Sequence, residues 1–220
     1  MGLEQITARI RAAEAAAGRP EGSVTLIAVS KVQPDERVAS ALAAGQRVFG
    51  ENYVQEAQSK WPAFRERFGD VKLHMIGPLQ SNKAKAAIGL FDVIHTLDRM
   101  SLARKLANAS EAGGRVPDLF VQVNTGDEPQ KAGILPDELG GFLEQVRALG
   151  LTPGGLMCIP PESEDPRRHF RMLRKLAEAE GLRQLSMGMS ADFEDAIAEG
   201  ATHVRVGSAI FGARDYSEKS

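Results

Sequence analysis

The residues of this chain best suited to chemistry are one lysine and two serines. Lys31 directly follows the first apolar run of the sequence, and Ser190 and Ser208 follow the last two, beside glycines. A partly desolvated lysine amine can lose its proton and attack a carbonyl carbon to form a Schiff base. A serine at the start of a helix offers its hydroxyl beside unpaired backbone N–H groups, which together suit a phosphate. The three residues therefore predict a ligand that carries both a carbonyl group and a phosphate.

Each of these residues also has a plainer interpretation. A lysine at the end of a strand is usually solvated, Ser190 could simply cap a helix, and Gly207 before Ser208 could simply form a turn. Asp192 opposes an anion site, because an early helical carboxylate competes for the same helix-end charge and has to point away. The combination leaves two ligand classes open, namely pyridoxal 5'-phosphate (PLP) and a sugar phosphate bound by a Schiff-base aldolase.

Arg205 bears on the choice between these ligands. In a strand, His203, Arg205 and Gly207 share one face, and Val204 and Val206 share the other. The valines suit the side that faces helices, so we expect Arg205 to point inward, near the predicted phosphate site. An arginine that faces a pyridine nitrogen disfavours its protonation by like charge, which weakens the ring as an electron sink. The alternative is an ion pair between Arg205 and an acid at the rim of the fold.

The elements that position these residues alternate between short apolar runs and longer amphipathic stretches. Eight strands are expected, at 24–30, 47–50, 71–76, 92–95, 119–124, 155–159, 184–188 and 203–206. Helices are expected at 3–17, 35–44, 53–64, 82–89, 99–112, 136–149, 166–180 and 191–199, with a short one after Ser208. This alternation predicts one α/β domain over residues 1–220, a (β/α)8 TIM-type barrel with an extra N-terminal helix. An open doubly wound sheet is the competitor, but no Gly-rich dinucleotide fingerprint follows the first strand.

Composition limits the function classes. The formal net charge of −2 gives no support for a nucleic-acid or anionic-membrane partner, and no stretch resembles a signal peptide or membrane span. The single cysteine, Cys158, cannot form an internal disulfide, and we expect it to be a small buried hydrophobe rather than a metal ligand or reactive thiol. We therefore expect a cytoplasmic protein without a metal. A polar tail after Tyr216 is expected to fray.

The chain resembles the YggS/PROSC family of PLP-homeostasis proteins along some 180 residues. The resemblance is carried in order by the segments 28–31 (AVSK), 49–56 (FGENYVQE), 74–83 (HMIGPLQSNK), 95–98 (HTLD), 123–125 (VNT), 155–159 (GLMCI), 185–190 (LSMGMS) and 204–212 (VRVGSAIFG). Each segment is modest support by itself, and the ordered set is highly specific.

The resemblance implies the barrel of the fold type III PLP enzymes, similar to the barrel domain of alanine racemase. Lys31 matches the lysine that forms the internal aldimine, and Arg205 matches the arginine facing the pyridine nitrogen. Ser190, Gly207 and Ser208 match phosphate-binding positions, with Ser208 in place of a common threonine. Asn52 lies in a motif that lines the cofactor pocket. The resemblance also implies a monomer without established turnover.

Alanine racemases add a C-terminal β-domain that supplies a second acid/base, and the sequence given extends only about a dozen residues beyond Ser208. We therefore expect that domain to be absent. The first hypothesis is a protein that stores, buffers or delivers PLP, with apo PLP-enzymes as recipients. The second is a small PLP-dependent racemase-like enzyme with Tyr53, His74 or His95 as the base, and the third is the Schiff-base aldolase. Lys83, Lys131 and Lys219 could bind PLP transiently, but we expect them to be surface lysines.

Overall fold

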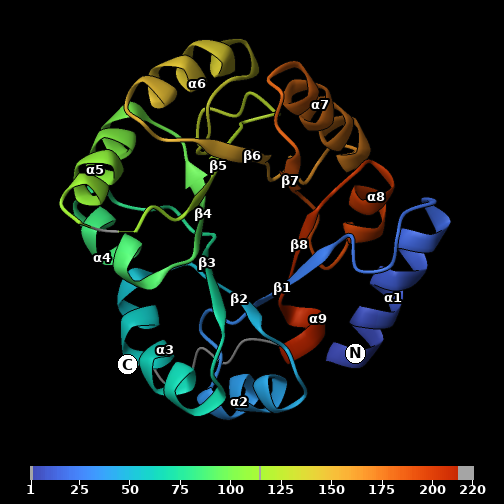
Figure 1. Ribbon diagram of the computed structural model, residues 1–220. Coiled ribbons are helices and arrows are strands. Elements are labelled where there is room, and N and C mark those ends of the chain that lie inside the picture. Colours follow the sequence, from blue (N-terminus) through green and yellow to red (C-terminus); the bar gives the residue numbers. More distant parts are fainter. Residues whose placement is uncertain (1, 114, 213–220) are drawn as a thin grey trace.

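The computed structural model of the chain describes residues 2–113 and 115–212, and it contains a closed barrel of eight parallel strands. Neighbours in sequence are neighbours in the barrel, and β8 pairs with β1 to close it (Figure 1). The strands are β1 (Thr25–Val29), β2 (Val48–Glu51), β3 (Lys72–Met75), β4 (Val93–Leu97), β5 (Asp118–Gln122), β6 (Pro153–Met157), β7 (Gln184–Ser186) and β8 (His203–Val206). The predicted fold class is therefore confirmed.

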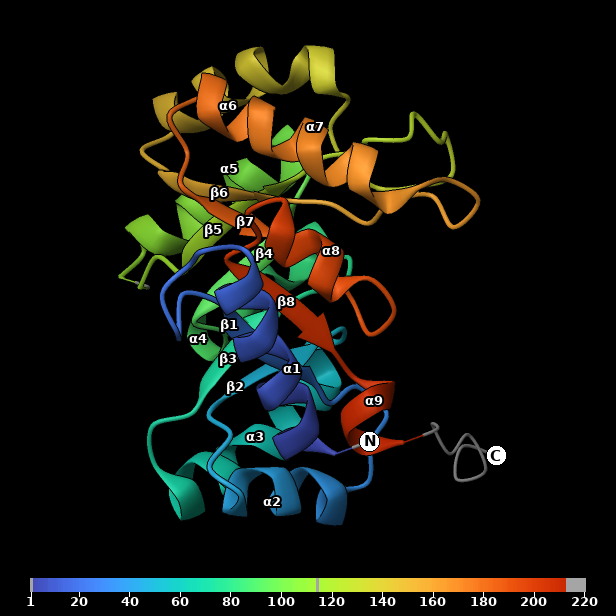
Figure 2. The ribbon, with the colours of Figure 1, turned by 90° about the vertical axis from the view of Figure 1, so that its right-hand side faces the viewer.

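Helices surround the barrel and follow the strands in turn. They are α2 (Asp35–Ala43), α3 (Val54–Phe68), α4 (Ala84–Leu90), α5 (Met100–Glu111), α6 (Leu139–Ala148), α7 (Pro166–Ala179), α8 (Phe193–Ala198) and the short α9 (Ser208–Phe211), with single 3-10 turns at Ser81–Lys83 and Pro136–Glu138. The extra helix α1 (Leu3–Ala16) lies beside α8, as both ribbon views show (Figures 1 and 2). The predicted N-terminal helix is thus confirmed.

Helix α7 shows how the sequence builds these elements. Asp165 caps it by accepting a hydrogen bond from the Arg167 backbone N–H at 3.0 Å, and Pro166 occupies the first turn, where no N–H is needed. Its buried residues are His169, Phe170, Leu173 and Ala177, spaced to form one apolar stripe. The helix then ends before Gly181, whose φ of +69° suits glycine.

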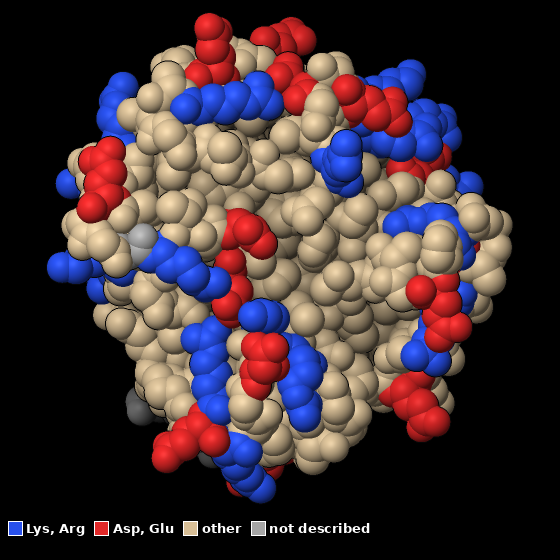
Figure 3. Space-filling view, viewed as in Figure 1, with Lys and Arg blue, Asp and Glu red and all other residues tan. Residues whose placement is uncertain are grey.

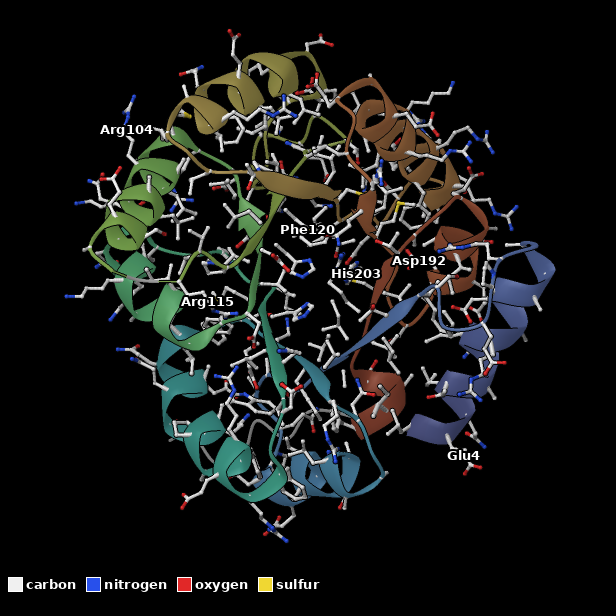
Figure 4. The ribbon with its side chains drawn as sticks, in the orientation of Figure 1. Glu4, Arg104, Arg115, Phe120, Asp192 and His203 are labelled. Atoms are coloured by element: carbon white, nitrogen blue, oxygen red, sulfur yellow. The ribbon has the colours of Figure 1, made fainter. Side chains whose placement is uncertain are left out.

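Two apolar layers result. One large cluster of buried side chains fills the space between the sheet and the helices, and it includes Val204 and Val206 of β8. A second, smaller cluster is formed by Val93, Phe120 and Met157. The rings of His95 and His203 pack against Phe120 at centroid distances of 4.4 and 5.1 Å, and Figure 4 shows Phe120 and His203 in the middle of the barrel. Polar side chains therefore occupy part of the barrel interior.

The predicted elements all occur, with shifted ends. The largest shift is in α3, which continues to Phe68 instead of ending at Phe64, because Arg65 is bound to the carbonyls of Val71 and Leu90 at its far end. Helix α8 begins at Phe193, two residues later than expected. The carboxyl ends of the strands gather on one face, which lies to the right in Figure 2. The tail after Tyr216 and Lys219 lie outside the described residues.

Candidate functional site

Two serine hydroxyls meet at the carboxyl ends of β7 and β8. Ser208 begins α9 directly after Gly207, and its Oγ lies 3.5 Å from Oγ of Ser190, which is in the turn after β7. A Cβ at position 207 would lie only 3.2 Å from both Cβ and the carbonyl oxygen of Val29 in β1. The glycine thus lets this corner approach the end of β1 closely. The structure thus brings two serine hydroxyls together beside a glycine turn at this end of the barrel.

The plainer interpretation of Ser190, as the cap of the following helix, is wrong. Asp192 is the residue that precedes α8, and its Oδ1 accepts a hydrogen bond from the Met189 backbone N–H at 2.6 Å. The Asp192 side chain thus bonds backward and caps none of the N–H groups of α8, in agreement with the expectation that it points away from them. The reason is local, because a carboxylate three residues after a free N–H can close a tight turn. Burial raises the pKa of Asp192, and the Arg205 guanidinium acts in the opposite direction.

Arg205 faces the barrel interior, as the strand alternation predicts. It is buried, and its guanidinium donates to Ser186 Oγ at 2.7 Å and to the carbonyl oxygen of Cys158 at 2.8 Å. Burial lowers the pKa of Arg205 from its ordinary value, although arginine remains cationic near neutral pH. The alternative of a direct ion pair at the rim is not observed among the described residues, where Arg205 is bound to neutral oxygens. A fixed positive charge therefore lies below the serine corner.

Lys31 lies in a tight turn at the end of β1. The Gln33 N–H donates to the Ser30 carbonyl at 3.2 Å, so Lys31 and Val32 are the two central residues of this turn. Val32 has φ +55°, a region that a β-branched residue adopts only at a cost. Lys31 is half-buried. The end of β1 also contacts Gly207, so the turn that carries the amine and the serine corner belong to neighbouring strands at the same end of the barrel.

Asn52 follows β2 and lies against the loop after β3. A Cβ at Gly77 would come within 2.5 Å of the Asn52 carbonyl oxygen, so only glycine allows the two loops to pack this closely. The Gly77 carbonyl in turn accepts a hydrogen bond from Thr96 Oγ1 at 2.8 Å, which ties in the end of β4. Asn52 itself is half-buried. It therefore lies in the wall formed by the loops after β2 to β4, across β1 from the serine corner.

The side chains considered as catalytic bases do not form a cluster at the mouth. His74 and His95 are buried, with His74 Nδ1 at 2.9 Å from His95 Nε2. Burial, with help from His203, lowers the pKa of His74 to about 3 and that of His95 well below its ordinary value. Tyr53 is 58% exposed at the start of α3. These positions favour packing roles for the two histidines.

Cys158 is fully buried, and burial raises the pKa of its thiol to about 12, which agrees with the prediction of an unreactive residue. Among the described residues, no group of three or more His, Cys, Asp or Glu side chains could hold a metal ion. Lys131, one of the lysines expected on the surface, forms an ion pair with Glu128 at 2.7 Å and donates to the Pro160 carbonyl. It is therefore partly held in place and is not a simple surface lysine.

Sequence reasoning missed a buried ionic cluster below Lys31. Lys60 of α3 lies between Glu51 and Glu56 at 3.4 and 3.0 Å and also donates to the Ser30 carbonyl at 3.1 Å. The only signal in the sequence is a Glu56–Lys60 pair at helical spacing, which is typical of an exposed helix face. The sequence around this pair does not predict that the helix face carrying Glu56 and Lys60 packs against the strands.

The face of the barrel opposite the serine corner carries side chains of both charges. Figure 3 shows the face of the barrel away from the carboxyl ends of the strands, with basic and acidic side chains interspersed around an uncharged centre. Asp92, which directly precedes β4, pairs with both Arg65 and Arg115. No helix within residues 2–113 and 115–212 has the length and apolar character needed to cross a membrane.

Comparison with known proteins identifies the family of this chain. The family model for the alanine racemase N-terminal domain matches residues 2–215. A pyridoxal phosphate homeostasis protein of Pseudomonas aeruginosa is 45% identical over 222 residues, which cover 97% of this chain and 95% of that protein. The protein of the same name from Escherichia coli K12 is 43% identical over 229 residues, covering 99% and 97%. This chain belongs to the family of pyridoxal phosphate homeostasis proteins.

Solved structures agree with this family. PipY of Synechococcus elongatus, solved with PLP bound, is 40% identical, with a TM-score of 0.79 over 92% of this chain and all of PipY (100%). The same protein without PLP gives 41% identity and a TM-score of 0.80. More distant matches share the fold alone. The D-threo-3-hydroxyaspartate dehydratase of Delftia is 19% identical, and the match covers 59% of that longer chain.

Proposed function

We propose that this chain binds PLP reversibly through Lys31 and serves PLP homeostasis, without a dedicated catalytic turnover. The observation that carries the proposal is the approach of Ser190 Oγ and Ser208 Oγ to 3.5 Å, in a corner whose Gly207 abuts the same strand that ends at Lys31. Support comes from the family, whose members are named for this role, and from the PipY structure with PLP.

The residues present fit this cofactor at both of its ends. Ser190, Gly207 and Ser208 would hold the phosphate, with the two serine hydroxyls and the backbone of the Gly207 turn. Arg205 would face the pyridine nitrogen, and Asn52 would line the pocket wall. When bound, the cofactor supplies an aldehyde carbon that condenses with an amine, with formation of C=N and loss of water.

The side chains favour binding over turnover. A lysine attacks an aldehyde only in its unprotonated form, and Lys31 is half-buried in the turn at the end of β1. The buried guanidinium of Arg205 disfavours a proton on the ring nitrogen, which leaves the ring a weak electron sink. Release to an apo PLP-enzyme needs only exchange of one amine for another at the same carbon. We place this exchange in the cytoplasm and assign it to a monomer.

The alternative is a small racemase-like enzyme. It would need a second group able to take a proton from the α-carbon of a substrate. His74 and His95 are buried and hydrogen-bonded to each other, and Tyr53 is largely exposed. These positions disfavour a role of the three residues as the catalytic base of a racemase-like enzyme.

The test is reduction of the PLP-loaded protein with borohydride, followed by digestion and mass spectrometry. We expect a single stable adduct on Lys31, a yellow protein before reduction, and no adduct in Lys31→Ala. Lys83→Ala is the matched control and retains the adduct. An adduct that persists in Lys31→Ala would show that another amine is the anchor.

The racemase-like alternative has its own test. Common amino acids are incubated with the loaded protein in deuterated water, and α-deuterium incorporation is followed by NMR. We expect exchange no faster than with free PLP. Exchange well above that rate would establish the alternative.

A further inference from the structure

The turn that carries Lys31 is conformationally unfavourable in itself. Ser30 and Gln33 close it with one hydrogen bond of 3.2 Å, and the residue after Lys31 is Val32 at φ +55°. Turns with positive φ at the third residue favour glycine or asparagine. A β-branched residue persists there only when its surroundings hold the backbone in place. The sequence therefore requires a restraint outside the turn.

Lys60 and Glu56 supply that restraint from helix α3. Lys60 Nζ donates to the carbonyl of Ser30 at 3.1 Å, on one side of Lys31. Glu56 Oε1 accepts the N–H of Val32 at 2.7 Å, on the other side. The two side chains are paired with each other at 3.0 Å. The ion pair thus spans the backbone of Lys31 and fixes both of its peptide neighbours.

The buried carboxylate of Glu51, at the end of β2, contacts this ion pair. Glu51 is fully buried, and its Oε1 accepts from Ser30 Oγ at 2.8 Å, from Trp61 Nε1 at 3.1 Å and from Lys60 Nζ at 3.4 Å. Burial raises the pKa of Glu51, and Lys60 counteracts that shift.

Such a cluster adds little to net stability, because desolvation of the charges offsets their attraction. What it provides is geometry. A single ammonium group contacts the end of β1, the end of β2 and helix α3 at once, which leaves the turn little freedom to shift.

We propose that Lys60 and Glu56 are positioning residues that hold the Ser30–Gln33 turn so that the Lys31 amine meets the aldehyde of a ligand seated at the serine corner. This inference rests on the proposed function and adds to it a device for orienting the amine. Neither residue touches the ligand. Both act through the backbone on either side of Lys31.

The matched control is on the same helix. Arg65 of α3 pairs with Asp92 at 2.7 Å and binds the carbonyls of Val71 and Leu90, one turn beyond Lys60 and away from Lys31. Arg65→Met therefore removes a partly buried ion pair and helix anchor without touching the turn. A purely structural role for Lys60 would make Lys60→Met and Arg65→Met alike.

The experiment measures three quantities in wild type, Lys60→Met, Glu56→Ala and Arg65→Met. They are the dissociation constant for PLP, the pH midpoint of the absorbance of the Lys31 adduct, and the urea midpoint of the ligand-free protein. We expect PLP affinity to fall by about tenfold to a hundredfold in Lys60→Met and Glu56→Ala, with a shifted pH midpoint, since small misplacements of a reacting group have effects of this size. Arg65→Met should change only the urea midpoint.

The outcomes are distinguishable. Wild-type protein without an adduct on Lys31 refutes the proposed function and this inference with it. A wild-type adduct, together with affinity and pH midpoint unchanged in both Lys60→Met and Glu56→Ala, refutes the positioning role alone. If Lys60→Met fails to fold, Glu56→Ala decides, because it removes the acceptor of the Val32 N–H from a partly exposed side chain.

Discussion

Acid should destabilise this protein through three histidines inside the barrel, and one substitution should reveal it. Burial, followed by the charge of Arg205, lowers the pKa of His203 to about 4, and the pKa values of His74 and His95 are lowered as well. In the unfolded chain each histidine has a pKa near 6.5. Protons therefore bind the unfolded state preferentially as the pH falls, and stability is lost from about pH 6.5 down to the folded values.

The magnitude at pH 5 depends little on the folded pKa values of His203 and His74, because about 4 and about 3 both lie below that pH. Each histidine with an unfolded pKa near 6.5 loses about 2 kcal/mol of folding free energy between pH 7 and pH 5. His203 and His74 together lose about 4 kcal/mol, a large part of the whole stability of many domains, and His95 acts in the same direction. His203→Gln keeps a polar group beside Thr202, to which His203 Nδ1 is bound at 2.9 Å, and removes one of the three titrations.

The assay is urea unfolding of the PLP-free protein at pH 7, 6 and 5, followed by fluorescence of Trp61, the single and fully buried tryptophan. Ligand must be removed, because bound PLP would add its own pH dependence. We expect wild type to lose about 2 kcal/mol more than His203→Gln between pH 7 and pH 5. Glu51 and Asp192, whose pKa values are raised, act in the opposite direction, but they are present in both proteins and cancel in the difference.

Parallel pH curves for the two proteins would refute the reasoning. They would mean that His203 carries the same protonation in the folded and unfolded states, and hence that the barrel interior admits a charged ring.

Two further predictions concern single side chains near the serine corner. Asp192→Asn should bind PLP more tightly by severalfold, because it removes a half-buried negative charge from the proposed phosphate site while an amide oxygen can still accept from the Met189 N–H. Titration of PLP absorbance checks this, and weaker binding would contradict it. Cys158 should not react with a thiol reagent at pH 8 in the folded protein and should react fully in denaturant, because burial raises its pKa to about 12. Rapid reaction of the native protein would show that the strand end opens.

The elements of this fold were predictable because each carries its own local signal. Runs such as 203–206 alternate valines with polar residues, and helices such as α7 have a cap, a stripe and a terminal glycine. The same local signals placed Lys31, Ser190 and Ser208 after strands, at positions where barrels carry their sites. Helix ends were less certain. Asp192 displaced the start of α8, because its side chain could bond backward to Met189 as readily as forward.

The sequence by itself determined the barrel and the order of its strands, and it predicted a site formed by Lys31, Asn52, Ser190, Arg205, Gly207 and Ser208, since periodicity and family motifs are properties of neighbouring residues. Only the tertiary structure decided which side chains share a buried volume. The Glu56–Lys60 spacing is typical of an exposed helix face, and the positions of His74 and His95 at strand ends did not predict that the two rings pack together. Their burial together arises from barrel closure, which brings α3 against β1 and places β3, β4 and β8 around one interior.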